Sequence, residues 1–186
     1  MKCLIVVLFY LSFLANSQSN DKLVFVMTHF RHGARSPAIV INNIDDIGEK
    51  WLNPGELTAI GERMHYLLGF RNRLRYINEK QFLSEKFNSN ELEVFTSNVG
   101  RTIVSLSSHL QGLYPQSEKL GKYITDNQLK TSDPPVELNH SRIIQEKNEL
   151  KDSALPNYMT LIPFKTFEVA GNSVDIFRRY FLIQVI

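Results

Sequence analysis

Residues 23–37, with the sequence LVFVMTHFRHGARSP, decide the fold of this chain. Leu23 to Thr28 is a nearly unbroken run of apolar residues rich in β-branched and aromatic side chains. Such a run is typical of a strand buried on both faces, as in a parallel sheet that helices cover. Polar turn residues from Arg31 to Pro37 end it. The stretch therefore predicts a buried strand with a polar loop at its carboxyl end.

A helix is expected next in the chain. Asn53, Pro54 and Glu56 form a helix start signal. Six apolar residues then follow at helical spacing, with arginines mostly on the other face, which is typical of an amphipathic helix. They are Leu57, Ile60, Met64, Leu67, Leu68 and Leu74. Gly61 costs such a helix about 1 kcal/mol relative to Ala, so we expect a close packing contact there.

A second strand and a second helix complete the pattern. Residues 92–97, LEVFTS, read as a strand, and apolar residues then recur every three or four positions from Val99 to Leu113. Pro115 ends this helix. The order strand, helix, strand, helix predicts an α/β fold with a parallel-sheet core and helices on both faces. Residues 116–153 predict loops and short elements, residues 155–167 extended chain, and residues 177–186 an apolar tail.

The first 17 residues are interpreted as a signal peptide, and residues 18–186 as the domain. Lys2 supplies a basic start, Leu4 to Leu14 is an apolar run, and Ala15 to Ser17 offers small residues for cleavage. The run is shorter than the about 20 residues of a membrane span. A buried N-terminal helix or a signal anchor is the alternative. Past Ser17 no segment is apolar enough to cross a membrane.

Composition and charge narrow the class of protein. An apolar content of 43% and a charged content of 22% are those of a globular domain. A formal charge of +2 gives no reason to expect a nucleic-acid partner. The single cysteine, Cys3, lies inside the signal, so the mature segment forms no disulfide. The sequon Asn139-His140-Ser141 fits a secreted glycoprotein, or one in a lysosomal or vacuolar lumen.

The loop after the first strand carries the candidate chemistry. In open α/β sheets, ligands bind outside the carboxyl ends of the strands. Here Arg31 and Arg35 flank His32, and Gly33 lets a ligand approach the backbone closely. Guanidinium groups match phosphate oxygens, and two nearby cations lower the pKa of a histidine. These residues predict an anion site beside a nucleophilic imidazole.

Arg101 is a third candidate cation, because it lies past the second strand at the start of the next helix. A helix start offers free backbone N–H groups to an anion. If the two strands are sheet neighbours, this arginine converges on the same pocket as Arg31 and Arg35. His65 and His109, inside the two helices, are interpreted as surface or hydrogen-bonded histidines and not as catalytic ones.

The run from Phe25 to Pro37 resembles the signature of the histidine acid phosphatases, the secreted branch of the histidine phosphatase superfamily. The segment LTAIG at residues 57–61, with His65 and Gly69, is similar to the helix that follows in that family. Thr96-Ser97, Gly100-Arg101-Thr102 and Leu113-Tyr114-Pro115 resemble its next motif. The resemblance covers about residues 23–115 and implies a phosphoglycerate-mutase-like fold.

The resemblance also implies a reaction on phosphate monoesters. His32 would attack phosphorus and form a phosphohistidine, which water then hydrolyses. Arg31, Arg35 and Arg101 would bind the phosphoryl oxygens and stabilise their charge. No cofactor or metal is implied, and the sequence contains no metal-ligand cluster.

One departure from the family concerns the acid. The family completes its site with a His-Asp pair, in which the aspartic acid protonates the leaving group, and this sequence contains no His-Asp dipeptide. We therefore expect a fragment, incomplete at its C-terminus and weakly active or inactive as given. The alternatives are a secreted non-catalytic phosphoester-binding protein and a mutase-like enzyme, although the signal peptide and Arg35-Ser36-Pro37 argue against the mutase.

Overall fold

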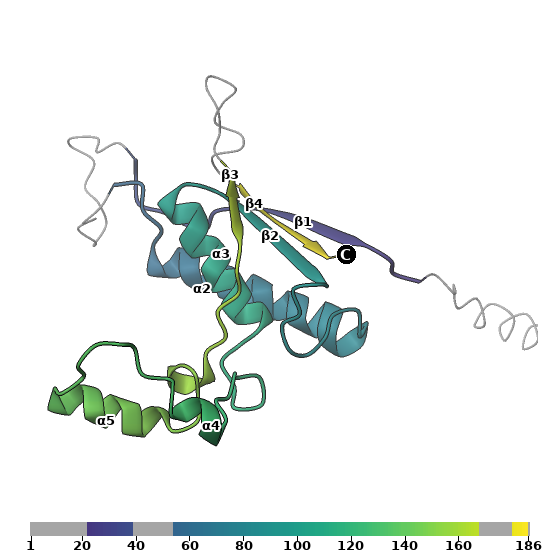
Figure 1. Cartoon of the computed structure of the whole chain (residues 1–186). Coiled ribbons are helices and arrows are strands. Elements are labelled where there is room, and N and C mark those ends of the chain that lie inside the picture. The colour runs from purple at the N-terminus through teal and green to yellow at the C-terminus, as the bar shows by residue number, and fades with distance from the viewer. Residues whose placement is uncertain (1–21, 39–53, 168–179, 186) are drawn as a thin grey trace, which may run out of the picture.

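The computed structural model describes residues 22–38, 54–167 and 180–185 (Figure 1). The expected signal peptide and Asn53 lie outside the described residues. Strands and helices follow in the order β1 (Val26–Arg31), α2 (Ala59–Asn72), η1 (Arg73–Glu79, a π-helix), β2 (Leu92–Ser97), α3 (Gly100–Leu113), α4 (Asp126–Leu129), α5 (Ser141–Leu150), η2 (Pro156–Tyr158, a 3₁₀ turn), β3 (Lys165–Phe167) and β4 (Tyr180–Val185). This is an α/β chain, as predicted, and β2 and α3 have nearly the predicted bounds.

The four strands form one sheet in the order β1-β4-β2-β3. Strands β2 and β3 are parallel, whereas β4 is antiparallel to both of its neighbours, β1 and β2. Strands β1 and β2 therefore point the same way although β4 lies between them. Their carboxyl ends lie at the same end of the sheet, which is where the predicted loop and the start of α3 follow.

Among the described residues, α2 and α3 both cover the same face of the sheet. They pack against each other, and α3 also packs against β2 and β4 (Figure 1). Phe30 of β1 contacts rings from both helices, His65 of α2 and His109 of α3. Two right-handed crossovers that advance in one direction across a sheet place their helices on one face, which accounts for this arrangement.

Strand β1 is half-buried on one face and exposed on the other, so the prediction of burial on both faces was wrong. Its exposure alternates along the strand, and Met27 is 57% exposed. Phe30 on the other face packs against the core. An apolar sequence with no polar alternation gave no sign of which face α2 and α3 would cover.

The buried face of α2 also differs from the prediction. The predicted apolar stripe points outward, because Ile60 is 63% and Leu67 56% exposed. The buried positions recur every four residues as Gly61, His65 and Gly69, and Arg73 continues them into η1. The helix begins at Ala59 with Thr58 as its N-cap, later than the start signal around Pro54 suggested.

Glycines explain why α2 presents this face. A Cβ on Gly69 would lie 1.9 Å from the carbonyl oxygen of His109, and one on Gly112 would lie 2.0 Å from that of Tyr66. The backbones of α2 and α3 therefore touch at two glycines, one from each helix. Close backbone contact requires the small residues of α2 at the interface and turns its large apolar residues away.

The core lies between the sheet and the two long helices. Its central residues include Leu92 and Val94 of β2 and Leu106, Leu110 and Leu113 of α3. Helices α4 and α5 lie apart from the sheet (Figure 1). In the part of the chain that the structure describes, no helix is both long and apolar enough to cross a membrane.

Candidate active site

The loop after β1 is hydrogen-bonded to two other segments of the chain, α3 and residues 56–58. The Gly33 N–H donates to Ser105 Oγ of α3 at 3.0 Å. The carbonyl oxygen of Ala34 accepts from both the backbone N–H and the hydroxyl of Thr58, at 3.0 and 2.9 Å. The Ser36 N–H donates to the Glu56 carbonyl oxygen at 2.9 Å. These bonds give the short polar loop a defined backbone beside His32.

Gly33 is required by the packing of this loop on α2. A Cβ on Gly33 would lie 2.5 Å from the carbonyl oxygen of Gly61, and one on Gly61 would lie 2.2 Å from that of Ala34. The predicted close contact at Gly61 is therefore confirmed, and its partner is the loop that carries His32. In this structure, the missing side chain of Gly33 allows α2 to pack closely against the loop.

The ring of His32 is held in one tautomer. Its Nδ1 lies 2.8 Å from the carbonyl oxygen of Gly33. A carbonyl oxygen can only accept, so Nδ1 carries the hydrogen and donates it. The neutral ring then has its lone pair on Nε2, which is the atom available to attack an electrophile.

Burial and nearby cations disfavour protonation of that ring. The pKa of His32 is lowered, first by the desolvation that burial causes and then by the charges of Arg101, Arg31 and Arg35. The hydrogen bond to Gly33 acts in the opposite direction and raises the pKa. All three predicted arginines therefore act on the predicted histidine.

Arg101 acts on His32 although β1 and β2 are not neighbours in the sheet, which was the condition for its prediction. Strand β4 separates β1 from β2, yet Arg101 is the largest of the three cationic effects on His32. It is the second residue of α3, and Ser105 one turn later donates to its carbonyl oxygen at 2.7 Å. Arg35 donates to the carbonyl oxygen of Ser36 at 2.7 Å.

Two side chains next to the loop were not predicted as parts of the site. Ser105 is fully buried, and His65 is 2% exposed. Burial lowers the pKa of His65, and a hydrogen-bonding interaction with the Arg31 backbone acts in the opposite direction. The position of Ser105 one helical turn after Arg101 is the sequence signal that could have identified it.

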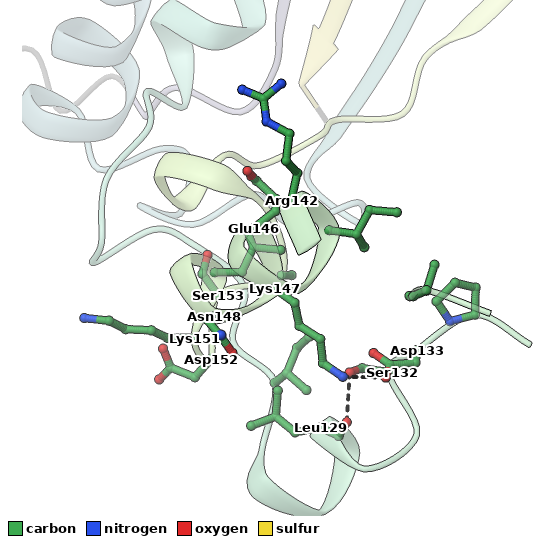
Figure 2. Close-up of a pocket in the computed structure, with 16 residues that line it drawn as sticks. Leu129, Ser132, Asp133, Arg142, Glu146, Lys147, Asn148, Lys151, Asp152 and Ser153 are labelled. Carbon is green, nitrogen blue, oxygen red and sulfur yellow. Dashed lines mark hydrogen bonds and ion pairs between the residues drawn. The ribbon is translucent and has the colours of Figure 1, made fainter. Parts of the chain in front are cut away.

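The described residues also form a pocket of about 970 Å³ away from this loop. It lies between α4, α5 and the chain around them, and is lined by apolar side chains such as Leu129 and Ile143 together with the ion pair between Lys147 and Asp133 (Figure 2). No predicted site residue lines this pocket. The candidate chemistry therefore belongs to the loop after β1.

The fold and the site together define an α/β protein with a histidine among three arginines at the strand ends. Residues 43–180 match the family model described as histidine phosphatase superfamily (branch 2). The chain belongs to that family. Residues 31–37 precede the matched range, so the roles of Arg31, His32 and Arg35 depend on the motif and its geometry.

Curated relatives carry the names of acid phosphatases. Putative acid phosphatase 11 of Caenorhabditis elegans is 40% identical over 55% of this chain and 25% of its own length. Lysosomal acid phosphatase of Xenopus laevis is 39% identical over 60% of this chain and 25% of its own. Prostatic acid phosphatase of Bos taurus is 36% identical over 60% of this chain and 28% of its own. The chain thus spans about a quarter of the length of these relatives.

Proposed function

We propose that this chain carries the phosphoryl-accepting site of an acid phosphatase, which hydrolyses phosphate monoesters through a phosphohistidine at His32. The observation that supports this most is the convergence of Arg31, Arg35 and Arg101 on the ring of His32. That ring carries its hydrogen on Nδ1, which leaves the lone pair of Nε2 available for attack. The names of the relatives support the same substrate class.

The reaction runs in two steps. Nε2 of His32 attacks phosphorus while the bond to the ester oxygen breaks, and the electron pair leaves with that oxygen, which takes up a proton to become an alcohol. Water then attacks the phosphorus of the phosphohistidine, giving inorganic phosphate and restoring the ring. The three guanidinium groups stabilise the negative charge on the phosphoryl oxygens in both transition states.

Trapping the phosphoenzyme tests the nucleophile. The full chain is mixed with a radiolabelled aryl phosphate and quenched rapidly without acid, because phosphohistidine is acid-labile. We expect label on the wild-type chain and none on His32→Ala. His140→Ala is the matched control, since His140 is an exposed histidine at the start of α5. Label retained in His32→Ala would show that another residue is the nucleophile.

The anion site is tested independently of turnover. Removing one guanidinium that binds vanadate should weaken its binding by about 1.5–3 kcal/mol, the range for a charged hydrogen bond. We therefore expect this loss in Arg35→Ala and no loss in Arg63→Ala, which removes an exposed arginine from α2. Equal vanadate affinity in Arg35→Ala and the wild type would count against the site. Normal vanadate binding without a phosphoenzyme would support the non-catalytic alternative.

The leaving group decides how fast this chain turns over. Among the described residues, the side chains that act on the pKa of His32 are all arginines, and none of them carries a carboxyl group. General acid catalysis typically contributes about 10²–10⁴-fold. We therefore propose that the chain as given acts weakly on alkyl phosphates and better on aryl phosphates, whose leaving groups are weak bases. Comparable turnover of both would contradict this.

We also propose that residues 1–17 direct the chain into the secretory pathway, to the outside or to a lysosomal or vacuolar lumen. The basic and apolar N-terminus supports this, and one relative is named a lysosomal acid phosphatase. N-terminal sequencing of the protein from its own cells should find a start near Gln18. An intact Met1 on a cytosolic protein would rule the route out.

A further inference from the structure

The backbone around His32 is fastened on both sides by buried side chains from two different helices. On one side, the buried ring of His65 interacts with the backbone of Arg31. On the other side, Ser105 Oγ accepts from the N–H of Gly33 at 3.0 Å. Neither His65 nor Ser105 belongs to the chemistry proposed above, yet each touches a residue adjacent to the nucleophile.

Ser105 connects the two halves of the site. Its hydroxyl accepts from Gly33 and donates to the carbonyl oxygen of Arg101 at 2.7 Å. Gly33 in turn accepts the hydrogen bond from Nδ1 of His32 at 2.8 Å. The same buried hydroxyl therefore fixes the glycine that sets the His32 tautomer and the backbone of the arginine with the largest charge effect on that ring.

His65 acts on the peptide before the nucleophile. The Arg31 carbonyl and the His32 N–H belong to one planar peptide, so holding that carbonyl fixes the orientation of the whole peptide. The ring of His65 is itself held in place, because it packs edge-on against Phe30 at 6.4 Å and lies 6.2 Å from the ring of His109. Helix α2 approaches the loop closely enough for this contact because Gly33 and Gly61 lack side chains.

We infer that His65 and Ser105 are positioning residues, which together clamp the backbone of His32 so that its ring presents Nε2 to the phosphoryl group. This inference deepens the proposed function and rests on it. Neither side chain bonds to substrate. The clamp sets which ring nitrogen keeps its lone pair and where that nitrogen lies relative to the arginines. A misplacement of about 1 Å can cost roughly 100-fold in rate.

The test uses the full chain with ¹⁵N-labelled histidine rings, at a pH where His32 is neutral. Ring ¹⁵N shifts report which nitrogen carries the hydrogen, and the His32→Ala spectrum assigns the signals. Ser105→Ala and His65→Phe each remove one arm of the clamp, and phenylalanine keeps an aromatic ring against Phe30. We expect hydrogen to move from Nδ1 to Nε2 of His32, and phosphoenzyme formation to slow by roughly 10- to 100-fold.

Ser108→Ala is the matched control on the same helix. The Ser108 hydroxyl donates to the carbonyl oxygen of Val104 four residues earlier, as the Ser105 hydroxyl donates to that of Arg101. Within the described part of the chain, Ser108 makes no hydrogen bond to the loop. In Ser108→Ala, the tautomer of His32 and the rate of phosphoenzyme formation should equal those of the wild type. His65→Gln keeps a side-chain N–H for the Arg31 carbonyl and should stay close to the wild type in both measurements.

Two results would overturn the clamp. One is a Ser105→Ala chain that keeps Nδ1–H on His32 and the wild-type rate. The other is a folded His65→Gln chain that forms the phosphoenzyme as poorly as His32→Ala. This second result also decides the question if His65→Phe does not fold. Failure of the proposed function can be told apart from failure of the clamp. The first would appear as radiolabel retained in His32→Ala, whereas the tautomer measurement that tests the clamp requires no phosphoryl transfer.

Discussion

At the scale of single residues, the hydroxyl of Tyr114 is a buried polar group in an apolar environment. The side chain is 1% exposed, and its ring packs edge-on against Phe87 at 5.9 Å. Its hydroxyl has no hydrogen-bond partner among the described residues. Burial raises the pKa of Tyr114 to about 12, with Glu91 adding to the rise. The ring therefore stabilises the core while the hydroxyl costs free energy.

Tyr114→Phe should leave the free energy of unfolding unchanged or raise it by up to about 1 kcal/mol, because it removes a buried polar group without breaking a bond. Tyr123→Phe is the control, since the exposed Tyr123 hydroxyl donates to the Glu118 carbonyl oxygen. It should show no gain. Urea unfolding of both variants measures the difference, and a loss of more than 1 kcal/mol in Tyr114→Phe would reveal a partner for its hydroxyl.

At the scale of elements, the contact between α2 and α3 depends on two glycines. Gly69→Ala would bring a methyl group 1.9 Å from the carbonyl oxygen of His109, and the backbones would have to separate. Overpacking typically costs about 1–3 kcal/mol, which exceeds the gain of about 1 kcal/mol from the higher helix propensity of Ala. We expect Gly69→Ala to lower the urea midpoint.

The same exchange at Gly100 is the matched control for this contact. There the nearest atom to a new Cβ is Oε2 of Glu56 at 3.3 Å, the mobile end of an exposed side chain. Gly100→Ala should therefore be neutral or slightly stabilising. If both variants unfolded at the same urea concentration, the glycine contact between the helices would contribute nothing.

A second prediction at this scale compares equal truncations on the two helices. Leu106 of α3 is fully buried, whereas Leu67 of α2 is 56% exposed. Leu106→Ala should cost about 2–5 kcal/mol, and Leu67→Ala should stay within about 0.5 kcal/mol. Urea unfolding of both variants provides the measurement. Equal losses would mean that the apolar stripe of α2 is buried, as its spacing alone predicted.

At the scale of the whole molecule, buried histidines make stability depend on pH. Burial, with a smaller effect from His65, lowers the pKa of His109 from 6.5 to about 3. The pKa values of His65 and His32 are also lowered, again chiefly by burial. The unfolded chain therefore takes up protons below about pH 6.5 that the folded chain does not, so this contribution is complete above that pH and is lost toward acid.

His109 alone should remove about 2 kcal/mol of stability between pH 7 and pH 5, because each pKa unit corresponds to about 1.36 kcal/mol. His109→Gln should flatten the pH dependence by that amount, whatever its effect on stability at pH 7. Urea unfolding at pH 5, 6 and 7 measures the slope. A variant with the wild-type slope would show that His109 takes up its proton in the folded state.

The sequence by itself determined β2, α3 and the two chain segments that supply the predicted site residues. The spacing of apolar residues predicted α3, and the apolar run at 92–97 predicted β2. Both predictions succeeded because these patterns depend only on residues that are close together in the sequence. The loop from Arg31 to Arg35 and the start of α3 were identified as site segments because both follow strands, and the structure brings Arg101 to His32. The roles assigned to these residues stay predictions.

Only the tertiary structure decided which faces meet. The position of β4 between β1 and β2, the inward turn of Gly61, His65 and Gly69, and the bonds of Ser105 to Gly33 and Arg101 are all contacts between segments distant in sequence. The apolar stripe of α2 gave the wrong face, because hydrophobic spacing records how many apolar residues a helix has on a side. It does not record that two backbones can meet only where side chains are missing.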